Sequence, residues 1–381
     1  MKVRIRDIGE IYTGNTPSKK NILYWNSDDI GFVKPDIIAD DAIIRINKEK
    51  CKEFISFCAI DKARIVPKNS VFVTCIGSIG KIGISKDRLA FNQQINAIVP
   101  NKNIDKEYLA YALYANKKKL QNIANAPVVP IINKTQFNDF ELNIEFDTNK
   151  QYQITETLNI ISTILDKMNK ELELLDELVK ARFVEMFGDP LFNPKSFPIR
   201  RIDEVAYLNK GITYSPEDVS NEGLIVLRSS NIKGNKFDLE DLVFIKKEVK
   251  LGKMVHENDI LMCNRNGSAR LVGKVAMIPK LNANMTFGTF MTIIRSELYI
   301  YLFNYFQTEA FRQQIRFQTS VSINQISLPL LASVKVPIPP IELQNQFANF
   351  VKEVDKSRLE VQKSLKKTQE LFDSLIQKYF G

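Results

Sequence analysis

The sequence predicts an α/β fold of the mixed α+β kind, in which two related globular domains are joined by two long helices packed as an antiparallel coiled coil. Three observations lead to this prediction. Segment Gln151–Phe187 contains no glycine or proline and ends at Gly188. Segment Ile341–Phe380 is also free of both residue types. Landmarks of the first globular piece recur about 190 residues later, which indicates a duplicated unit of globular piece and long helix.

Both long segments carry apolar residues at alternating spacings of three and four, which is the period of a coiled-coil seam. At a rise of about 1.5 Å per residue, the first segment would form a helix roughly 55 Å long. A helix of that length needs a partner, and the second segment supplies one in the same register. The predicted seam consists of Leu158, Ile161, Leu165, Met168, Leu172, Leu175, Val179, Val351, Val354, Val361, Leu365, Phe372 and Leu375.

The chain between and before these helices is predicted to form two globular domains. Residues 188–198 contain three prolines and therefore mark a boundary. Within the domains, we expect opening strands at Val3–Gly9 and Ile199–Val205, a buried strand at Val71–Ile76, and a single helix at Asp105–Ile123. The predicted division is a first globular domain over 1–147, a central helix over 148–187, a linker with the second globular domain over 188–338, and a C-terminal helix over 339–381.

The composition favours a polyanionic partner and offers few candidate catalytic residues. The net charge of +9 suits such a partner, although a basic protein without one fits the charge equally well. There is one histidine, and the four cysteines have no metal-ligand spacing, so we expect no metal and no histidine-based catalysis. The cysteine usage suggests a reducing compartment, and no apolar run reaches the length of a membrane span, so the chain is expected in the cytoplasm.

Two segments resemble catalytic motifs but lack their essential residues. Gly77–Lys81 is too short for a Walker A loop, and Ile82 follows where serine or threonine is needed. Pro339-Pro340 has isoleucine on both sides, where an adenine methyltransferase would need an asparagine or aspartate and an aromatic residue. The chain is therefore predicted not to be an enzyme.

Two similar helices that pack antiparallel would relate the two globular domains by an approximate two-fold axis. The backbone of duplex DNA has the same symmetry, and one helical turn spans roughly 34–36 Å. Such a scaffold could hold two readers over two half-sites of different sequence. The same helices would equally serve a coiled-coil scaffold that binds other proteins without nucleic acid, and the geometry alone leaves this alternative open.

At five places the chain resembles the specificity subunit (HsdS) of type I restriction-modification systems. These signatures are Gly14–Pro17, Gly77–Lys81, Leu227–Ile232, the linker from Phe187 to Lys195, and Pro337–Glu342 with Gln344. The first signature has Asn15 where a second glycine is common, and the second domain lacks a counterpart of Pro17.

The resemblance implies two target recognition domains, each reading one half of a bipartite, asymmetric DNA target. It also implies that the coiled coil sets the gap between the half-sites and docks two modification (methyltransferase) subunits, with restriction subunits bound through them. S-adenosylmethionine, ATP and Mg would then belong to those partner subunits. The resemblance further implies that the chain binds DNA and takes part in defence against foreign DNA.

Reading bases requires side chains with directional donors and acceptors, such as arginine or lysine for guanine and asparagine or glutamine for adenine. The loop Cys263–Arg270 is the strongest candidate, because it places two arginines and two amides directly after a buried strand. Solvated loops and phosphate contacts are the alternatives for these polar residues. The candidates are Asn15, Thr16, Lys19, Lys20, Ser78, Lys81, Asn92, Gln93 and Gln94 in the first domain, and Thr213, Tyr214, Arg228, Asn231, Arg265, Asn266, Arg270 and Lys274 in the second.

Overall fold

The computed structural model describes residues 1–124, 129–316 and 325–381, which divide into two compact units. Unit 1 comprises Met1–Lys170 with Gln362–Gly381, and unit 2 comprises Glu171–Val361. Each long helix contributes one part to each unit, so the four-segment division made from the sequence stays a prediction. No helix among the described residues is both long and apolar enough to cross a membrane.

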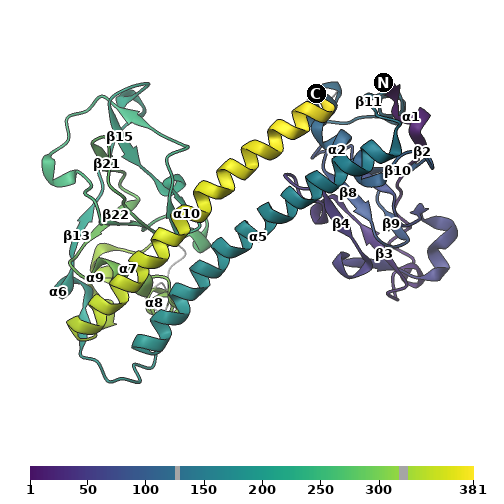
Figure 1. The fold of residues 1–381 in the computed structure, drawn as a ribbon. Coiled ribbons are helices and arrows are strands. Elements are labelled where there is room, and N and C mark those ends of the chain that lie inside the picture. Colours follow the sequence, from purple (N-terminus) through teal and green to yellow (C-terminus); the bar gives the residue numbers. More distant parts are fainter. Residues whose placement is uncertain (125–128, 317–324) are drawn as a thin grey trace. The chain divides into compact units, whose positions relative to one another are not determined.

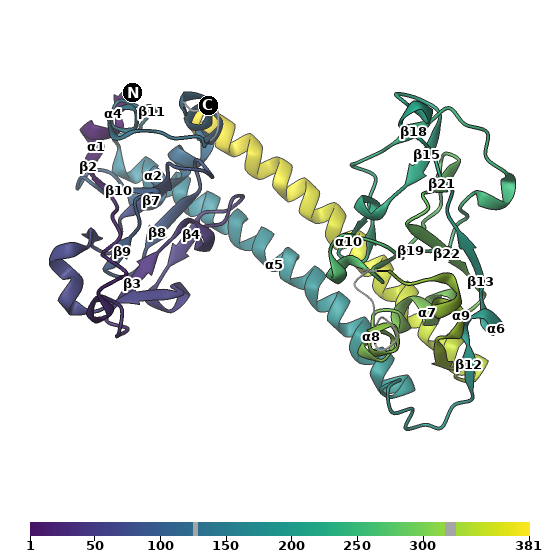
Figure 2. The ribbon, with the colours of Figure 1, turned by 180° about the vertical axis from the view of Figure 1, so that it is seen from behind.

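Unit 1 is built on two sheets. The five-stranded sheet has the order β2 (Gly9–Thr13), β10 (Ile95–Pro100), β7 (Val71–Thr74), β8 (Ile82–Ser85), β4 (Ile44–Ile46), and Figure 2 shows these strands side by side. Neighbours in this sheet are antiparallel except β4 and β8. The four-stranded sheet has the order β5 (Glu53–Ile55), β3 (Ile30–Val33), β9 (Leu89–Phe91), β6 (Ile65–Val66).

The opening segments of both globular pieces differ from the predicted strands. In unit 1, the strand β1 (Lys2–Arg4) pairs with β11 (Glu141–Asn143), and a helical turn, α1 (Ile5–Ile8), follows it. Ile5 and Ile8 are three residues apart and both buried, so one face of this turn enters the core. In unit 2, β12 (Ile199–Arg201) pairs with β23 (Lys335–Pro337), and α6 (Ile202–Val205) follows. The prediction of a single strand was therefore wrong in both places.

The helix predicted over Asp105–Ile123 is in fact two helices, α2 (Lys106–Ala115) and α3 (Lys117–Ile123). The Asp105 side chain accepts the N–H of Tyr108 and caps α2. The break lies at Asn116, whose side-chain amide donates to the Ala112 carbonyl at 2.9 Å. Helix α2 packs on β7 and β8 in the main core of unit 1, and the short helix α4 (Lys134–Asn138) leads to β11.

Unit 2 repeats the central antiparallel sheet of unit 1. Its strands are β13 (Tyr207–Lys210), β22 (Met291–Arg295), β19 (Ile260–Cys263) and β20 (Val275–Met277), in the order 13-22-19-20 that matches 2-10-7-8. A second sheet contains β14 (Val219–Ser220), β18 (Phe244–Ile245), β15 (Leu224–Leu227) and β21 (Met285–Phe287). Strands β15 and β21 are parallel, as are β3 and β9 in unit 1.

The remaining elements of unit 2 complete its core around the sheet. Helices α7 (Tyr299–Tyr305), α8 (Glu309–Arg316) and α9 (Leu328–Ser333) supply buried residues to the same hydrophobic cluster as β19 and β22. A small hairpin is formed by β16 (Ile232–Lys233) and β17 (Lys236–Phe237).

The two long helices have nearly the predicted bounds, α5 spanning Thr148–Phe187 and α10 spanning Ile341–Phe380 (Figure 1). In unit 1, the first part of α5 and the last part of α10 share one core with Tyr108, whose ring lies 5.1 Å from that of Phe380. In unit 2, Asp176 pairs with Arg358 at 2.7 Å and the ring of Phe183 lies 5.6 Å from that of Phe347. Residue numbers therefore rise along one helix as they fall along the other, as in an antiparallel pair.

The predicted seam residues face the interior of these units. Leu158, Ile161, Leu165, Val179, Val354 and Phe372 are buried, and the other seven are partly buried. The aromatic ends of the helices anchor them to the globular parts, since Phe183 stacks on Tyr301 at 5.4 Å.

Candidate nucleic-acid interface

Three loops of unit 1 meet at one edge of the five-stranded sheet. The pairing register places Thr13 beside Asn96, Ile95 beside Thr74 and Val73 beside Ile82. The end of β2, the turn from β7 to β8 and the turn from β9 to β10 therefore lie together. Most of the polar candidates of the first domain belong to these three loops, although the first and the last of them, Asn15 and Gln94, are 79 residues apart in the chain.

Gly14 makes this convergence possible, because the chain there has no room for a side chain. A Cβ at Gly14 would lie 2.0 Å from the carbonyl oxygen of Asn92. The backbone N–H of Gly14 donates to the Ile95 carbonyl at 3.0 Å, which holds the loop against the turn. The hydroxyl of Thr16 then donates to the side-chain oxygen of Gln93 at 2.6 Å, so two of the predicted residues touch across the loops.

The exposed groups at this edge are Thr16, Ser78, Gln93 and, in part, Lys81 and Gln94. Asn15 is also exposed, but its amide donates to the Lys62 carbonyl at 2.8 Å and accepts the N–H of Arg64. Asn15 therefore ties the loop to residues 62–64.

Asn92 does not fit the prediction of direct DNA contact. Its side chain is buried at 6% exposure, and both ends of the amide are used inside the turn. The amide N–H donates to the Gln94 side chain at 2.8 Å, and the oxygen accepts the Gln94 backbone N–H at 3.1 Å. Asn92 is a positioning residue for Gln94, and the prediction that it reads a base is corrected.

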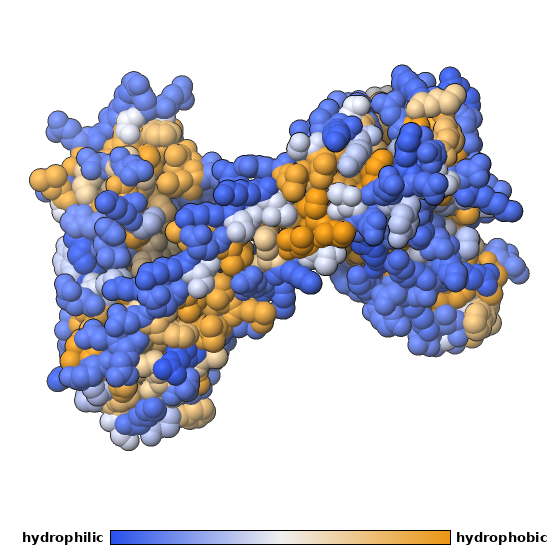
Figure 3. Space-filling view, in the orientation of Figure 1, coloured by the Kyte–Doolittle hydropathy of each residue, from blue (hydrophilic) through white to orange (hydrophobic). Residues whose placement is uncertain are grey.

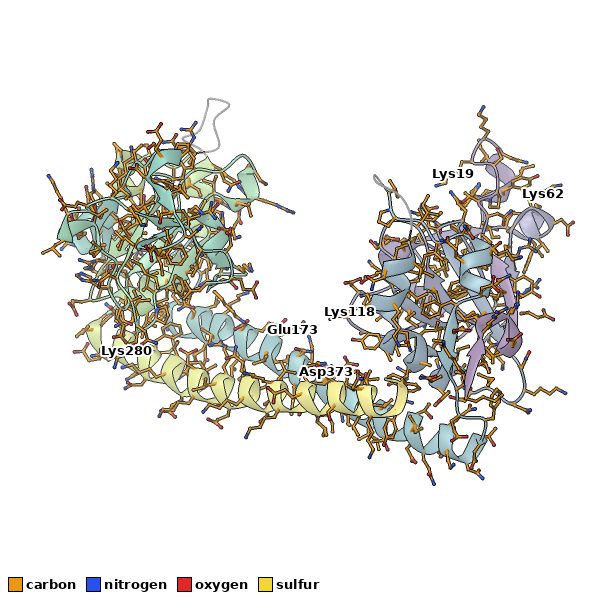
Figure 4. All side chains as sticks on the ribbon, turned by 90° about the horizontal axis from the view of Figure 1, so that it is seen from above. Lys19, Lys62, Lys118, Glu173, Lys280 and Asp373 are labelled. Atoms are coloured by element: carbon orange, nitrogen blue, oxygen red, sulfur yellow. The ribbon has the colours of Figure 1, made fainter. Side chains whose placement is uncertain are left out.

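Lys19 lies at the end of unit 1 that carries Lys62 (Figure 4), and both Lys19 and the next residue, Lys20, are exposed. Lys19 pairs with Glu53 at 3.1 Å and lies 5.1 Å from the centre of the Trp25 ring. Burial raises the pKa of Glu53, but hydrogen bonds from Lys34 and Lys19 outweigh that effect and hold the pKa below its usual value. Lys19 is therefore partly neutralised, whereas Lys20 is an exposed cation.

Unit 2 forms the corresponding edge with different side chains. Lys210 lies beside Thr292, and Cys263 beside Met291, so the loops after β13, β19 and β21 converge. Gly211 has the role of Gly14, since a Cβ there would lie 2.0 Å from the carbonyl oxygen of Gly288. The shared close approach explains why both repeats have a glycine at the end of the first central strand. Thr213 is exposed and Tyr214 partly buried in the loop that follows.

The predicted loop Cys263–Arg270 lies at this edge and contacts the segment that follows β15. The amide of Asn266 donates to the Ser229 hydroxyl at 3.2 Å. The N–H of Gly288 donates to the Leu227 carbonyl at 2.9 Å, which brings Arg228 to the same end of the unit. Arg228 is partly buried and pairs with Asp241 at 2.8 Å.

The other candidates of unit 2 differ in their access to solvent. Arg265 and Arg270 are exposed, whereas Lys274 is partly buried and donates to the Ile232 carbonyl at 2.9 Å. Asn231 is fully buried, and its amide bonds the carbonyls of Asp238 and Asp241 at 2.9 and 3.0 Å. Because no part of Asn231 reaches solvent, the prediction that it contacts DNA is wrong, and its role is to fold the turn.

Two exposed groups at these edges were not predicted from the sequence. Phe290 lies in the turn between β21 and β22 and is 50% exposed. Arg64 lies beside Asn15, with its guanidinium 5.8 Å from the Tyr12 ring centre. Aligning Phe91–Gln94 with Phe287–Phe290 would have revealed Phe290, because both segments follow a buried strand and precede the next one. Within the described ranges, no group of three or more histidine, cysteine or acidic residues is placed to hold a metal ion.

Comparison with known proteins gives consistent results over the whole chain. The model of the type I restriction modification DNA specificity domain matches residues 1–176 and again 194–371. The MjaIX specificity subunit of Methanocaldococcus jannaschii is 22% identical, over 98% of this chain and 91% of that protein. The EcoKI specificity subunit of Escherichia coli is 30% identical over 41% of this chain and 35% of that protein. The crystal structure of the S subunit of a type I system from M. genitalium superposes with a TM-score of 0.56 at 17% identity, covering 100% of this chain and 96% of that one.

The two matched stretches lie largely in unit 1 and in unit 2, and this chain belongs to the family of type I restriction-modification DNA specificity proteins. The double match confirms the predicted duplication. Its relatives are specificity subunits of restriction enzymes, which also confirms that the chain is the non-catalytic specificity component.

Proposed function

We propose that this chain is the DNA sequence-specificity subunit of a type I restriction-modification enzyme, and that each unit reads one half of a bipartite, asymmetric target. One observation carries the proposal. In each unit, exposed polar and cationic side chains from three loops gather at one edge of an antiparallel sheet, held there by a glycine without room for a Cβ. The side chains at equivalent places differ, since Gln94 in unit 1 corresponds to Phe290 in unit 2, so the two half-sites should differ in sequence.

The charge of the chain supports a DNA partner. The net charge of +9 includes exposed cations in both units, such as Lys20 in unit 1 and Arg265 and Arg270 in unit 2. Phosphate contacts by such residues release counterions, so binding should weaken steeply as salt rises. The amides and arginines at the loop tips are the groups suited to base edges.

The long helices carry exposed apolar residues that suit a docking surface for methyltransferase subunits. In unit 1, Ile160 and Ile164 are 57% and 39% exposed, and Figure 3 shows apolar surface over this part of α5. In unit 2, Leu174 and Leu178 are 50% and 46% exposed. The members of each pair are four residues apart and share one helix face. One such pair in each unit fits two copies of a partner, and the helices between the units would set the gap between half-sites.

In this assembly the chemistry belongs to the partners. We propose that S-adenosylmethionine is bound by the modification subunits, and that ATP and Mg are bound by restriction subunits attached through them. The chain itself would orient these subunits on their target in the cytoplasm.

The proposal is tested with the purified complex of this chain and its methyltransferase partner. The complex should bind duplex DNA with an affinity that falls as salt is raised, and should transfer methyl groups from S-adenosylmethionine, whereas neither component alone should do so on the same target. A stable complex that binds no DNA at low salt would instead favour a protein scaffold. Methyl transfer by this chain alone would contradict the non-catalytic role.

A further inference from the structure

The turn between β21 and β22 presents an aromatic ring on a rigid backbone. The carbonyl of Phe290 accepts the N–H groups of Asn264 and Arg265 at 2.9 and 3.3 Å. The turn is therefore pinned to the end of β19, while the Phe290 ring stays 50% exposed. An exposed phenylalanine at the edge of a sheet contributes little to folding, so its position calls for another explanation.

Arg265 lies over this ring with its hydrogen-bonding groups available. Its guanidinium carbon is 5.0 Å from the centre of the Phe290 ring, within the range of a cation–π contact. Arg265 is exposed, and no carboxylate in the described part of the chain pairs with it, unlike Arg228, which is bound to Asp241. The backbone of Arg265 is also fixed by a bridge to Gln325. The ring thus holds a free, planar donor group in a set direction.

The same backbone position in unit 1 carries a different side chain. Gln94 accepts the N–H of Cys75 at 2.7 Å through its carbonyl, as Phe290 accepts that of Asn264. Cys75 and Asn264 each follow the last residue of the equivalent strands β7 and β19. This backbone contact is therefore shared, and at this position the outward group changes from an amide to an aromatic ring. Such a change alters what the surface can bind without altering how it folds.

We propose that Arg265 and Phe290 together read one pyrimidine–guanine step of the second half-site. This inference rests on the proposed function. Arginine donates to O6 and N7 of guanine in the major groove, and phenylalanine makes apolar contact with the 5-methyl group of thymine. The 5.0 Å separation of the two groups lies between one and two base spacings of about 3.4 Å, so the two side chains would contact neighbouring base pairs. Phe290 selects the thymine methyl, and Arg265, held by the ring, selects the adjacent guanine.

The test uses the complex with its methyltransferase partner and duplexes that carry its target. Each thymine of the second half-site is replaced in turn by uracil, which removes only the 5-methyl group, and each guanine by 7-deazaguanine, which removes the N7 acceptor. For the wild-type chain, one uracil replacement should lower methylation by about fourfold, the effect of losing one buried methyl contact. The sensitive guanine should be its immediate neighbour. A sensitive thymine and guanine that are not adjacent, or no sensitive thymine, would overturn the inference.

Two variants connect the base to the side chain. Phe290→Ala should methylate the thymine and uracil duplexes at the same rate, and Arg265→Ala should lose the sensitivity to 7-deazaguanine. Phe57→Ala, which removes a 62% exposed phenylalanine in unit 1, should keep both sensitivities. If Phe290→Ala lowers both rates but retains the thymine-to-uracil ratio, Phe290 does not read the methyl group. If Arg265→Ala lowers the methylation rate of all duplexes equally, Arg265 binds phosphate.

Failure of this inference is distinguishable from failure of the proposed function. If the wild-type complex methylates no split target, the proposed function itself is wrong. If it methylates a split target but shows no coupling between Phe290 and a thymine methyl, only the assignment of this pair is overturned. The base replacements in the wild-type complex need no variant, so they decide the matter even where a variant folds poorly.

Discussion

Substituting alanine for Gly14 and Gly211 should damage one half-site each. In either unit the new Cβ would lie 2.0 Å from a backbone carbonyl oxygen, whereas ordinary contacts begin near 3.4 Å. The loop or the turn must therefore move by more than about 1 Å, and forcing such overlap into a packed site typically costs about 1–3 kcal/mol. Since every 1.4 kcal/mol is about tenfold, recognition by the displaced loops should fall by roughly five- to 150-fold.

The assay is the methylation rate of the complex on its target and on duplexes with one base pair changed in either half. Gly14→Ala should reduce discrimination in the first half-site, and Gly211→Ala in the second. Gly252→Ala is the matched control, because a Cβ there meets no atom within 4 Å and Gly252 lies outside the loops that form the edge. Thermal unfolding shows whether the whole unit is affected. If both substitutions leave the melting temperature and the discrimination unchanged, or if each impairs both half-sites equally, the convergence of loops does not form the reading site.

Three further predictions concern the units and the helices. Arg45→Met removes hydrogen bonds to Glu107 at 2.6 Å and to Asn159 at 2.7 Å. In a denaturant titration it should lower the free energy of unfolding by about 1–2 kcal/mol. Lys52→Met breaks the exposed pair with Asp36 and should change the free energy of unfolding by less than about 1 kcal/mol. Burial raises the pKa of Cys51 to about 11 and that of Cys75 to about 12, so their thiolates are scarce at pH 8. Iodoacetamide should therefore label the exposed Cys58 first, as measured by mass spectrometry. Rapid labelling of Cys75 in the folded chain would contradict the packing. Ile164→Glu with Leu178→Glu should abolish co-purification of the methyltransferase partner, while the exposed pair Phe192→Glu and Leu251→Glu should leave it intact.

The long helices were predictable because their signals are local. The seam spacing and the absence of glycine and proline fix α5 and α10 to within a few residues, and Gly188 and Pro190 end the first one. The opening helical turn was not predictable. Apolar and polar residues alternate in Val3–Gly9 well enough for a strand, whereas burial of Ile5 and Ile8 in the core favours a helical turn. Tertiary packing decided between two local patterns.

The candidate site was predictable in its residue types but only partly in its members. The amides and cations near glycine turns lie in loops that meet at one sheet edge, through strand pairings that span many residues. The burial of these side chains could not be predicted. Asn92 and Asn231 have the chemistry of base readers, but their side-chain amides form hydrogen bonds within their own turns. Phe290 was missed because an aromatic residue between two strands looks like part of the core.

The most direct test of the central claim is a map of DNA methylation in cells that express this chain with its methyltransferase partner. The account predicts a new methylated motif that is split, asymmetric and of fixed gap, present only when both proteins are expressed. Its two halves should respond separately to substitutions in unit 1 and in unit 2. A continuous motif, or no new methylation despite a stable complex, would contradict the assignment of one half-site to each unit.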